Sequence, residues 1–133
     1  MSGESDLRTL LRTMSATLDT GLYVFVTMPE GMALDGLRPR MMFRETEGVT
    51  CILRREEAEA RGLAHEFPCR MITLKVHSAL DAVGFLARIT TALAAHDMGV
   101  NPVSGFFHDH LFVPDGKEDL ALEVLRALAR DAA

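Results

Sequence analysis

The most informative part of the sequence is the stretch KVHSALDAVGFL at residues 75–86. After one expected helix, it is followed by GVNP at residues 99–102. It predicts a strand, a capped turn that carries a glycine, an amphipathic helix and a second strand that opens with a polar residue. A helix N-terminus beside a strand edge can hold both the carboxylate and the ammonium group of a small zwitterion. The pattern therefore favours sensing over catalysis.

From residue 71 onward, periods of two and of 3.6 residues alternate along the chain. They predict strand, helix, strand, strand and helix at residues 71–77, 79–96, 100–107, 111–113 and 118–129. This order lacks only a closing strand. It builds an antiparallel sheet with both helices on one face, which is the ferredoxin-like arrangement of the α+β class.

The first half is expected to begin with an amphipathic helix over residues 6–17, because Leu7, Leu10, Leu11, Met14 and Leu18 form one apolar stripe. Ser5 or Asp6 can cap this helix, and residues 19–21 are expected to end it. A β-rich run at residues 22–27 then predicts an inner strand.

Turn residues divide the rest of the first half. Residues 29–39 leave room for at most one helical turn, and residues 41–54 predict a hairpin in which Gly48 supplies a positive φ. A short charged helix is expected at residues 56–61, closed by Gly62. Residues 63–69 are expected to form the joint between the halves.

Composition limits the classes of partner. The chain has 133 residues, is 48% hydrophobic and carries a formal net charge of −5, and neither half is basic. We therefore expect no nucleic-acid partner and no anionic-membrane partner. No apolar run approaches the ~18 residues that a membrane span requires, and the polar N-terminal residues do not resemble a signal peptide. Cys51 and Cys69 have no metal-binding or redox spacing, so buried free thiols and a cytoplasmic location are expected.

Two short motifs resemble the ACT domain, a small ligand-binding module that regulates amino-acid metabolism. Residues 81–86 resemble the family's D-x-P-G-x-L turn, with Val83 in place of the proline, and residues 99–101 resemble its G-I-N strand opening. Residues 101–114 and 45–50 are similar to motifs of a bacterial group of short, stand-alone tandem ACT proteins of uncharacterised function.

The resemblance implies two ACT-like units in tandem, an N-terminal unit at residues 1–67 and a C-terminal unit at residues 68–133. It also implies that no catalytic domain is attached and that the chain forms a homodimer through its sheet edges. The first half departs from the family pattern, because residues 29–40 are too short for a full crossover helix.

The candidate ligand site follows from the turn and from the second strand. Ser78 and Asp81 fit an S-x-x-D capping box, which by itself can explain both residues. The N–H groups left over in the first helical turn favour an anion, and Gly84 removes a side chain that would block its approach. Asn101 can bind the other end of the ligand, or it can serve only as a turn residue. The expected ligand-binding residues are Ser78, Leu80, Asp81, Ala82, Val83, Gly84, Phe85, Asn101, His108 and His110.

The His108-Asp109-His110 cluster admits three interpretations. Structural hydrogen bonding is preferred, followed by a place on the rim of the ligand site and then by metal binding. We expect no cofactor, no metal and no catalytic residue, because no phosphate loop, nucleophile elbow or H-E-x-x-H motif is present. A non-enzymatic module that binds an amino acid or a similar metabolite is thus the leading hypothesis. The alternatives are a small enzyme or metal-binding protein that uses the histidine cluster, and a protein-interaction module without a small-molecule site.

Overall fold

The computed structural model of the chain describes residues 3–29, 31 and 35–132. By contact, the chain forms two compact units, a larger one of Met1–Thr20 with Arg70–Ala133 and a smaller one of Gly21–Cys69. Strands β1 (Ser15–Met28) and β4 (Glu66–Lys75) contribute residues to both. The predicted tandem division at residues 67 and 68 is a different grouping, along the sequence, and stays a prediction.

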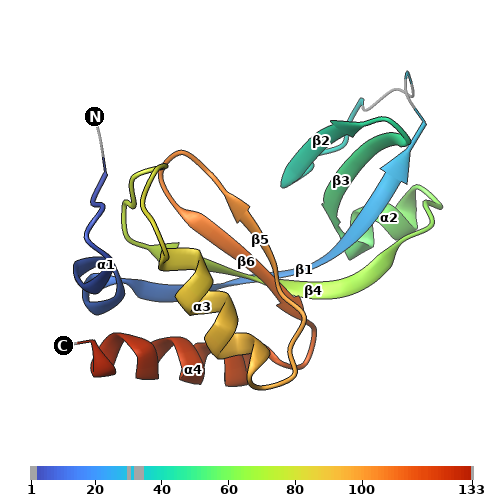
Figure 1. Cartoon of the computed structure of the whole chain (residues 1–133). Helices are drawn as coiled ribbons and strands as arrows, with labels where there is room; N and C mark the ends of the chain where they lie inside the picture. Colours follow the sequence, from blue (N-terminus) through green and yellow to red (C-terminus); the bar gives the residue numbers. More distant parts are fainter. Residues whose placement is uncertain (1–2, 30, 32–34, 133) are drawn as a thin grey trace. The chain divides into compact units, whose positions relative to one another are not determined.

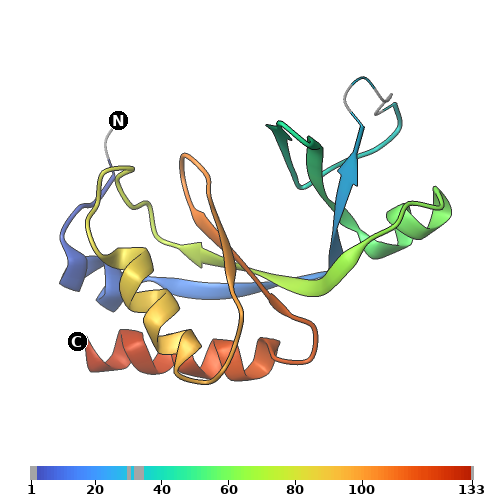
Figure 2. The ribbon, with the colours of Figure 1, turned by 45° about the vertical axis from the view of Figure 1, so that its right-hand side comes forward.

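The larger unit has the predicted order of elements. Its strands lie in the order β1-β4-β6-β5, where β5 is Asn101–Ser104 and β6 is Asp109–Pro114. Helix α3 (Phe85–Ala94) follows β4, helix α4 (Glu118–Asp131) follows β6, and both lie on one side of the sheet (Figures 1 and 2). The ferredoxin-like arrangement is therefore confirmed. Strand β1 lies beside β4, where that arrangement would place its closing strand.

One apolar core fills the space between these helices and the sheet. Helix α3 contributes Phe85, Ile89 and Leu93, which are buried at every fourth position and so share one helical face. The same cluster includes residues of β4, β6, α4 and the N-terminal helix, among them Leu10, Leu11, Ile72, Leu74, Leu111, Val113, Ala121, Leu122 and Leu125. Burial of this apolar surface is the main term that stabilises the unit.

The N-terminal helix is shorter than its leucine stripe predicts. Helix α1 spans only Leu7–Thr13, and Met14 is already extended with a ψ of 147°. Asp6 caps the helix as expected, because its side chain accepts a hydrogen bond from the Thr9 N–H at 2.9 Å. The helix predicted over residues 14–17 is wrong. From Ser15 the chain is a strand whose alternate residues Ala16 and Leu18 pack on the core, so Leu18 fits a period of two as well as the helical stripe.

Two further boundaries differ from the prediction. The expected joint at residues 63–69 is wrong in part, since β4 begins at Glu66 and continues through Pro68. The strand expected over residues 100–107 ends at Ser104, and Phe106 and Phe107 lie beyond it in the connection to β6. A backbone hydrogen bond of 2.9 Å from the Gly105 N–H to the His108 carbonyl closes this connection.

The smaller unit contains the predicted hairpin and short helix. Strands β2 (Met41–Glu45) and β3 (Gly48–Arg54) pair antiparallel, in the order β2-β3-β1, and helix α2 spans Arg55–Ala60. Gly48 has a φ of +149°, and a Cβ there would lie 2.5 Å from the carbonyl oxygen of Met28, so only glycine fits. The helical turn considered for residues 29–39 lies in part outside the described residues.

Candidate functional site

The loop before α3 does not form the capping box that the sequence predicts. Helix α3 begins at Phe85, and its N-cap is Gly84 in the left-handed conformation, with a φ of 91° and a ψ of −8°. The helix predicted from Ala79 onward is therefore wrong over residues 79–84. Val83, which falls within the helix predicted over residues 79–96, is 84% exposed.

The positive φ explains why the chain has a glycine at this position. A Cβ at residue 84 would meet only a methyl carbon of Leu7, at an ordinary 3.5 Å, so space is not the constraint. The left-handed conformation is the constraint, because it costs other L-residues roughly 1–2 kcal/mol. The helix predicted over residues 79–96 would include Gly84 in its interior, whereas Gly84 precedes the helix as its N-cap.

A cavity of about 140 Å³ opens at the N-terminus of α3. One wall is the loop and first helical turn, which contribute five of the residues that the sequence proposes for ligand binding: Ser78, Leu80, Ala82, Gly84 and Phe85. The opposite wall is the β5–β6 hairpin, which contributes Ser104, Gly105 and Asp109. These three hairpin residues were not among the expected site residues.

Among the described residues, Asp109 supplies the only carboxylate that lines this cavity. Its side chain is 6% exposed, its Oδ1 accepts a hydrogen bond of 2.6 Å from Ser104 Oγ, and its Oδ2 accepts one of 3.3 Å from Ser78 Oγ. Thus Ser78 does not cap α3 but binds across the cavity to the hairpin. Each carboxylate oxygen can accept more than one hydrogen bond, so the two oxygens of Asp109 can still accept hydrogen bonds from a cationic group.

The first turn of α3 supplies donors on the other side of the cavity. The first hydrogen bond within the helix joins the Arg88 N–H to the Gly84 carbonyl at 3.0 Å. The N–H groups of Phe85, Leu86 and Ala87 precede it, and all three residues line the cavity. A helix N-terminus with such groups favours an anion.

Five predicted ligand-binding residues do not line this cavity: Asp81, Val83, Asn101, His108 and His110. Asn101 is an exposed residue at the start of β5, opposite Phe112. The Nδ1 atom of His110 lies 2.9 Å from Thr73 Oγ1. The Nδ1 atom of His108 is buried and has no hydrogen-bond partner among the described residues.

Of the His108-Asp109-His110 cluster, Asp109 thus lines the cavity, whereas the imidazoles of His108 and His110 do not. The signal that could have identified Asp109 is its position two residues before the apolar run that begins at Leu111, where a buried carboxylate needs partners. Within residues 3–29, 31 and 35–132, no three His, Cys, Asp or Glu side chains come close enough to hold a metal ion.

Comparisons with known proteins give the family. Models of the ACT domain match residues 2–70 and residues 66–127, so the chain belongs to the ACT-domain family, as its motifs indicated. A Vibrio cholerae protein of unknown function, described as a possible transport protein, is 40% identical; the match covers 92% of this chain and 95% of that one, with a TM-score of 0.85.

More distant structures share the fold. An Agrobacterium tumefaciens protein is 16% identical over 87% of this chain and 89% of its own, with a TM-score of 0.73. The regulatory subunit of aspartate kinase from Thermus thermophilus is 10% identical over 85% of this chain and 95% of its own, with a TM-score of 0.63. No curated protein matches the chain in sequence. Among the helices of the described residues, none is long and apolar enough to cross a membrane.

Proposed function

We propose that this chain is a non-enzymatic regulatory module that binds a small α-amino acid in the cavity between α3 and the β5–β6 hairpin. The observation that carries the proposal is the pairing of opposite polarities in one cavity. The buried Asp109 carboxylate faces a ligand ammonium group, and the N–H groups of Phe85, Leu86 and Ala87 face a ligand carboxylate. Membership of the ACT-domain family supports this role.

The open cavity also favours a small-molecule site over a protein-interaction module. A filled turn at Gly84 would have left no room for a ligand, whereas the turn borders a space of about 140 Å³. A small enzyme based on the histidine cluster has less support, since His108 and His110 do not line the cavity that Asp109 lines.

A thermal-shift screen against the standard amino acids tests this function. A ligand that binds only the folded state raises the melting temperature by mass action. For each amino acid that stabilises the protein, the matching amine without the carboxylate and the matching acid without the ammonium group are compared. We expect both analogues to lose the stabilisation. The proposal fails if no amino acid stabilises the chain, or if an analogue that lacks one charge stabilises it equally.

The partner that we propose is a second copy of the chain, paired through β5. This strand is last in the order of strands, so within the described part of the chain its outer edge carries backbone groups that no other strand pairs with. Phe106 and Phe107, each 58% exposed, lie at the end of the same hairpin and provide apolar surface for such a contact. Analytical ultracentrifugation should give a dimer, and replacing both phenylalanines by serine should weaken it.

We further propose a cytoplasmic location, because Cys51 and Cys69 are free and buried, as is usual in a reducing compartment.

A further inference from the structure

A second cavity, in the smaller unit, has a different chemistry from the first. It measures about 570 Å³ and includes in its lining three arginines and one tyrosine: Arg38, Arg40, Arg54 and Tyr23. We call it the arginine pocket. It shares no residue with the cavity at α3, so it is independent of the function proposed above.

Tyr23 is the buried residue of this pocket that holds two of its arginines in place. Its side chain is 1% exposed, and its hydroxyl oxygen accepts hydrogen bonds from Arg40 Nε at 3.2 Å and Arg40 Nη2 at 2.7 Å. The Cζ atoms of Arg40 and Arg54 lie 5.5 and 5.9 Å from the centre of the tyrosine ring. Two guanidinium groups are thus held against one aromatic ring, where cation–π attraction orders them.

The acidic residues that line the pocket neutralise these cations only in part. Glu56 lies 3.8 Å from Arg54 in an exposed pair, which is a weak contact. Glu57 accepts a hydrogen bond from the backbone N–H of Arg38 at 3.0 Å, so that carboxylate is engaged by the main chain. The guanidinium of Arg38 has no hydrogen-bond or ion-pair partner among the described residues. Three cations therefore border one cavity with two carboxylates.

We propose that the arginine pocket binds a small metabolite that carries a multivalent oxyanion, through the guanidiniums of Arg38 and Arg54. Guanidinium groups bind phosphate and carboxylate oxygens through paired N–H donors, and Arg40 is ordered on Tyr23 beside them. A ligand with more than one negative charge is expected, since more than one arginine faces the pocket. The buried phenol ring serves to hold the guanidiniums of Arg40 and Arg54 in place.

Isothermal titration calorimetry with the whole chain tests this site. One arm uses inorganic pyrophosphate, the other uses citrate, and sodium chloride holds the ionic strength constant in both. Binding of pyrophosphate alone indicates a phosphorylated metabolite, binding of citrate alone indicates a polycarboxylate, and binding of both indicates general oxyanion recognition. Each of these results supports the site if the variants below respond as expected.

The variants Arg38→Gln and Arg54→Gln should each weaken binding about tenfold, the size expected from losing one charged hydrogen-bond partner. Arg55→Gln is the matched control: it removes the same charge from the neighbouring position, but Arg55 pairs with Glu59 and does not line the pocket. It should bind as the parent does. Arg38→Gln removes no hydrogen bond or ion pair of the guanidinium with a described residue, so it should fold even if Arg54→Gln does not. Absence of binding in both arms, or equal weakening by Arg55→Gln, overturns the proposal.

Discussion

At the scale of single residues, Gly84 and Asp109 determine the geometry and the charge of the cavity. Gly84 turns the chain into α3 through a positive φ, and the first residues of this helix line the cavity. Asp109 lies across from them at the start of β6 and binds the hydroxyls of Ser78 and Ser104. One residue acts through its backbone and the other through its charge.

The conformation of Gly84 gives a stability prediction. Gly84→Ala should lower the free energy of unfolding by about 1–2 kcal/mol, because alanine must adopt the left-handed conformation. Gly84→Asn, the matched control, should lose less, since asparagine adopts this conformation more readily. Urea unfolding of the three proteins measures both differences. Equal stability of the parent and Gly84→Ala would show that the positive φ is not required.

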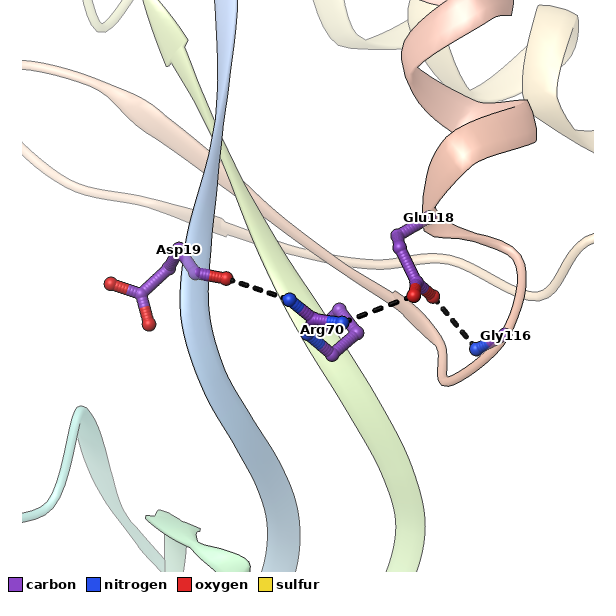
Figure 3. A network of polar contacts seen from close by, with 4 residues as sticks. All are labelled: Asp19, Arg70, Gly116 and Glu118. Atoms are coloured by element: carbon purple, nitrogen blue, oxygen red, sulfur yellow. Dashed lines mark hydrogen bonds and ion pairs between the residues drawn. The ribbon is translucent and has the colours of Figure 1, made fainter.

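Among the elements of the larger unit, one polar network joins β4 to α4 (Figure 3). Arg70 Nη1 lies 3.0 Å from Glu118 Oε2, and both side chains are less than one-fifth exposed. Arg70 also donates to the Asp19 carbonyl of β1 at 3.2 Å, and Glu118 accepts from the Gly116 N–H at 2.7 Å. A strand and the first turn of a helix are thus joined through one carboxylate.

Removal of this carboxylate should cost more than removal of an exposed one. Glu118→Gln should lower the free energy of unfolding by about 1–3 kcal/mol, because it removes the negative charge that pairs with Arg70 in a largely buried position. Glu59→Gln, which breaks the exposed Arg55–Glu59 pair at 3.4 Å, should change it by less than about 0.5 kcal/mol. Chemical denaturation of both variants measures the contrast. Similar small effects would mean that the Arg70–Glu118 pair contributes no more than a surface contact.

The cap of α1 predicts a pH dependence. Hydrogen bonds from the Thr9 hydroxyl and the Thr9 N–H lower the pKa of Asp6 below its ordinary value of 3.8. The folded state therefore favours the ionised form, so the cap stabilises above the unfolded pKa and loses its effect as the pH falls through the folded pKa. Asp6→Asn keeps a capping oxygen but cannot titrate. Its stability relative to the parent should improve on acidification from about pH 6 to about pH 2.5, as thermal unfolding can measure. A constant difference would contradict this assignment.

At the scale of the whole molecule, the two units have cores of different size. The cluster of the larger unit contains 14 buried apolar residues and that of the smaller unit contains 6, among the residues that the structure describes. Apolar burial is the main favourable term in folding, so we expect the smaller unit to open first. Both cysteines lie in the smaller unit, and they report on its opening.

Thiol labelling can detect that opening. Cys51 and Cys69 are buried, and burial raises the pKa of the Cys51 thiol, so neither should react with a thiol reagent in the native protein near about pH 8. As urea is added, both should become reactive before the loss of helical circular dichroism, to which α3 and α4 of the larger unit contribute. Coincident transitions would show that the two units unfold together.

The sequence predicts most of the fold because the apolar periods of β4, α3, β6 and α4 agree with their final environment. The prediction fails where one pattern fits two structures. Leu18 continues the apolar stripe of a helix in the sequence, but in the structure it belongs to strand β1 and packs on the core of the larger unit. Ser78 and Asp81 have the spacing of a capping box, but a residue with a positive φ intervenes before the helix. Local spacing cannot reveal that Asp109 meets Ser78, because 31 positions separate them and the sheet brings them together.

The most direct test of the proposed function compares two aspartates that differ in position. With an amino acid found in the thermal-shift screen, isothermal titration calorimetry is done on the parent, Asp109→Asn and Asp81→Asn, after urea unfolding shows that each is folded. Asp109 lines the cavity, whereas Asp81 is exposed and does not. We predict that Asp109→Asn weakens binding by about 10- to 100-fold, as expected when an ammonium group loses a charged acceptor, and that Asp81→Asn binds as the parent does. Unchanged binding by Asp109→Asn, or an equal loss in Asp81→Asn, would contradict the amino-acid site at α3.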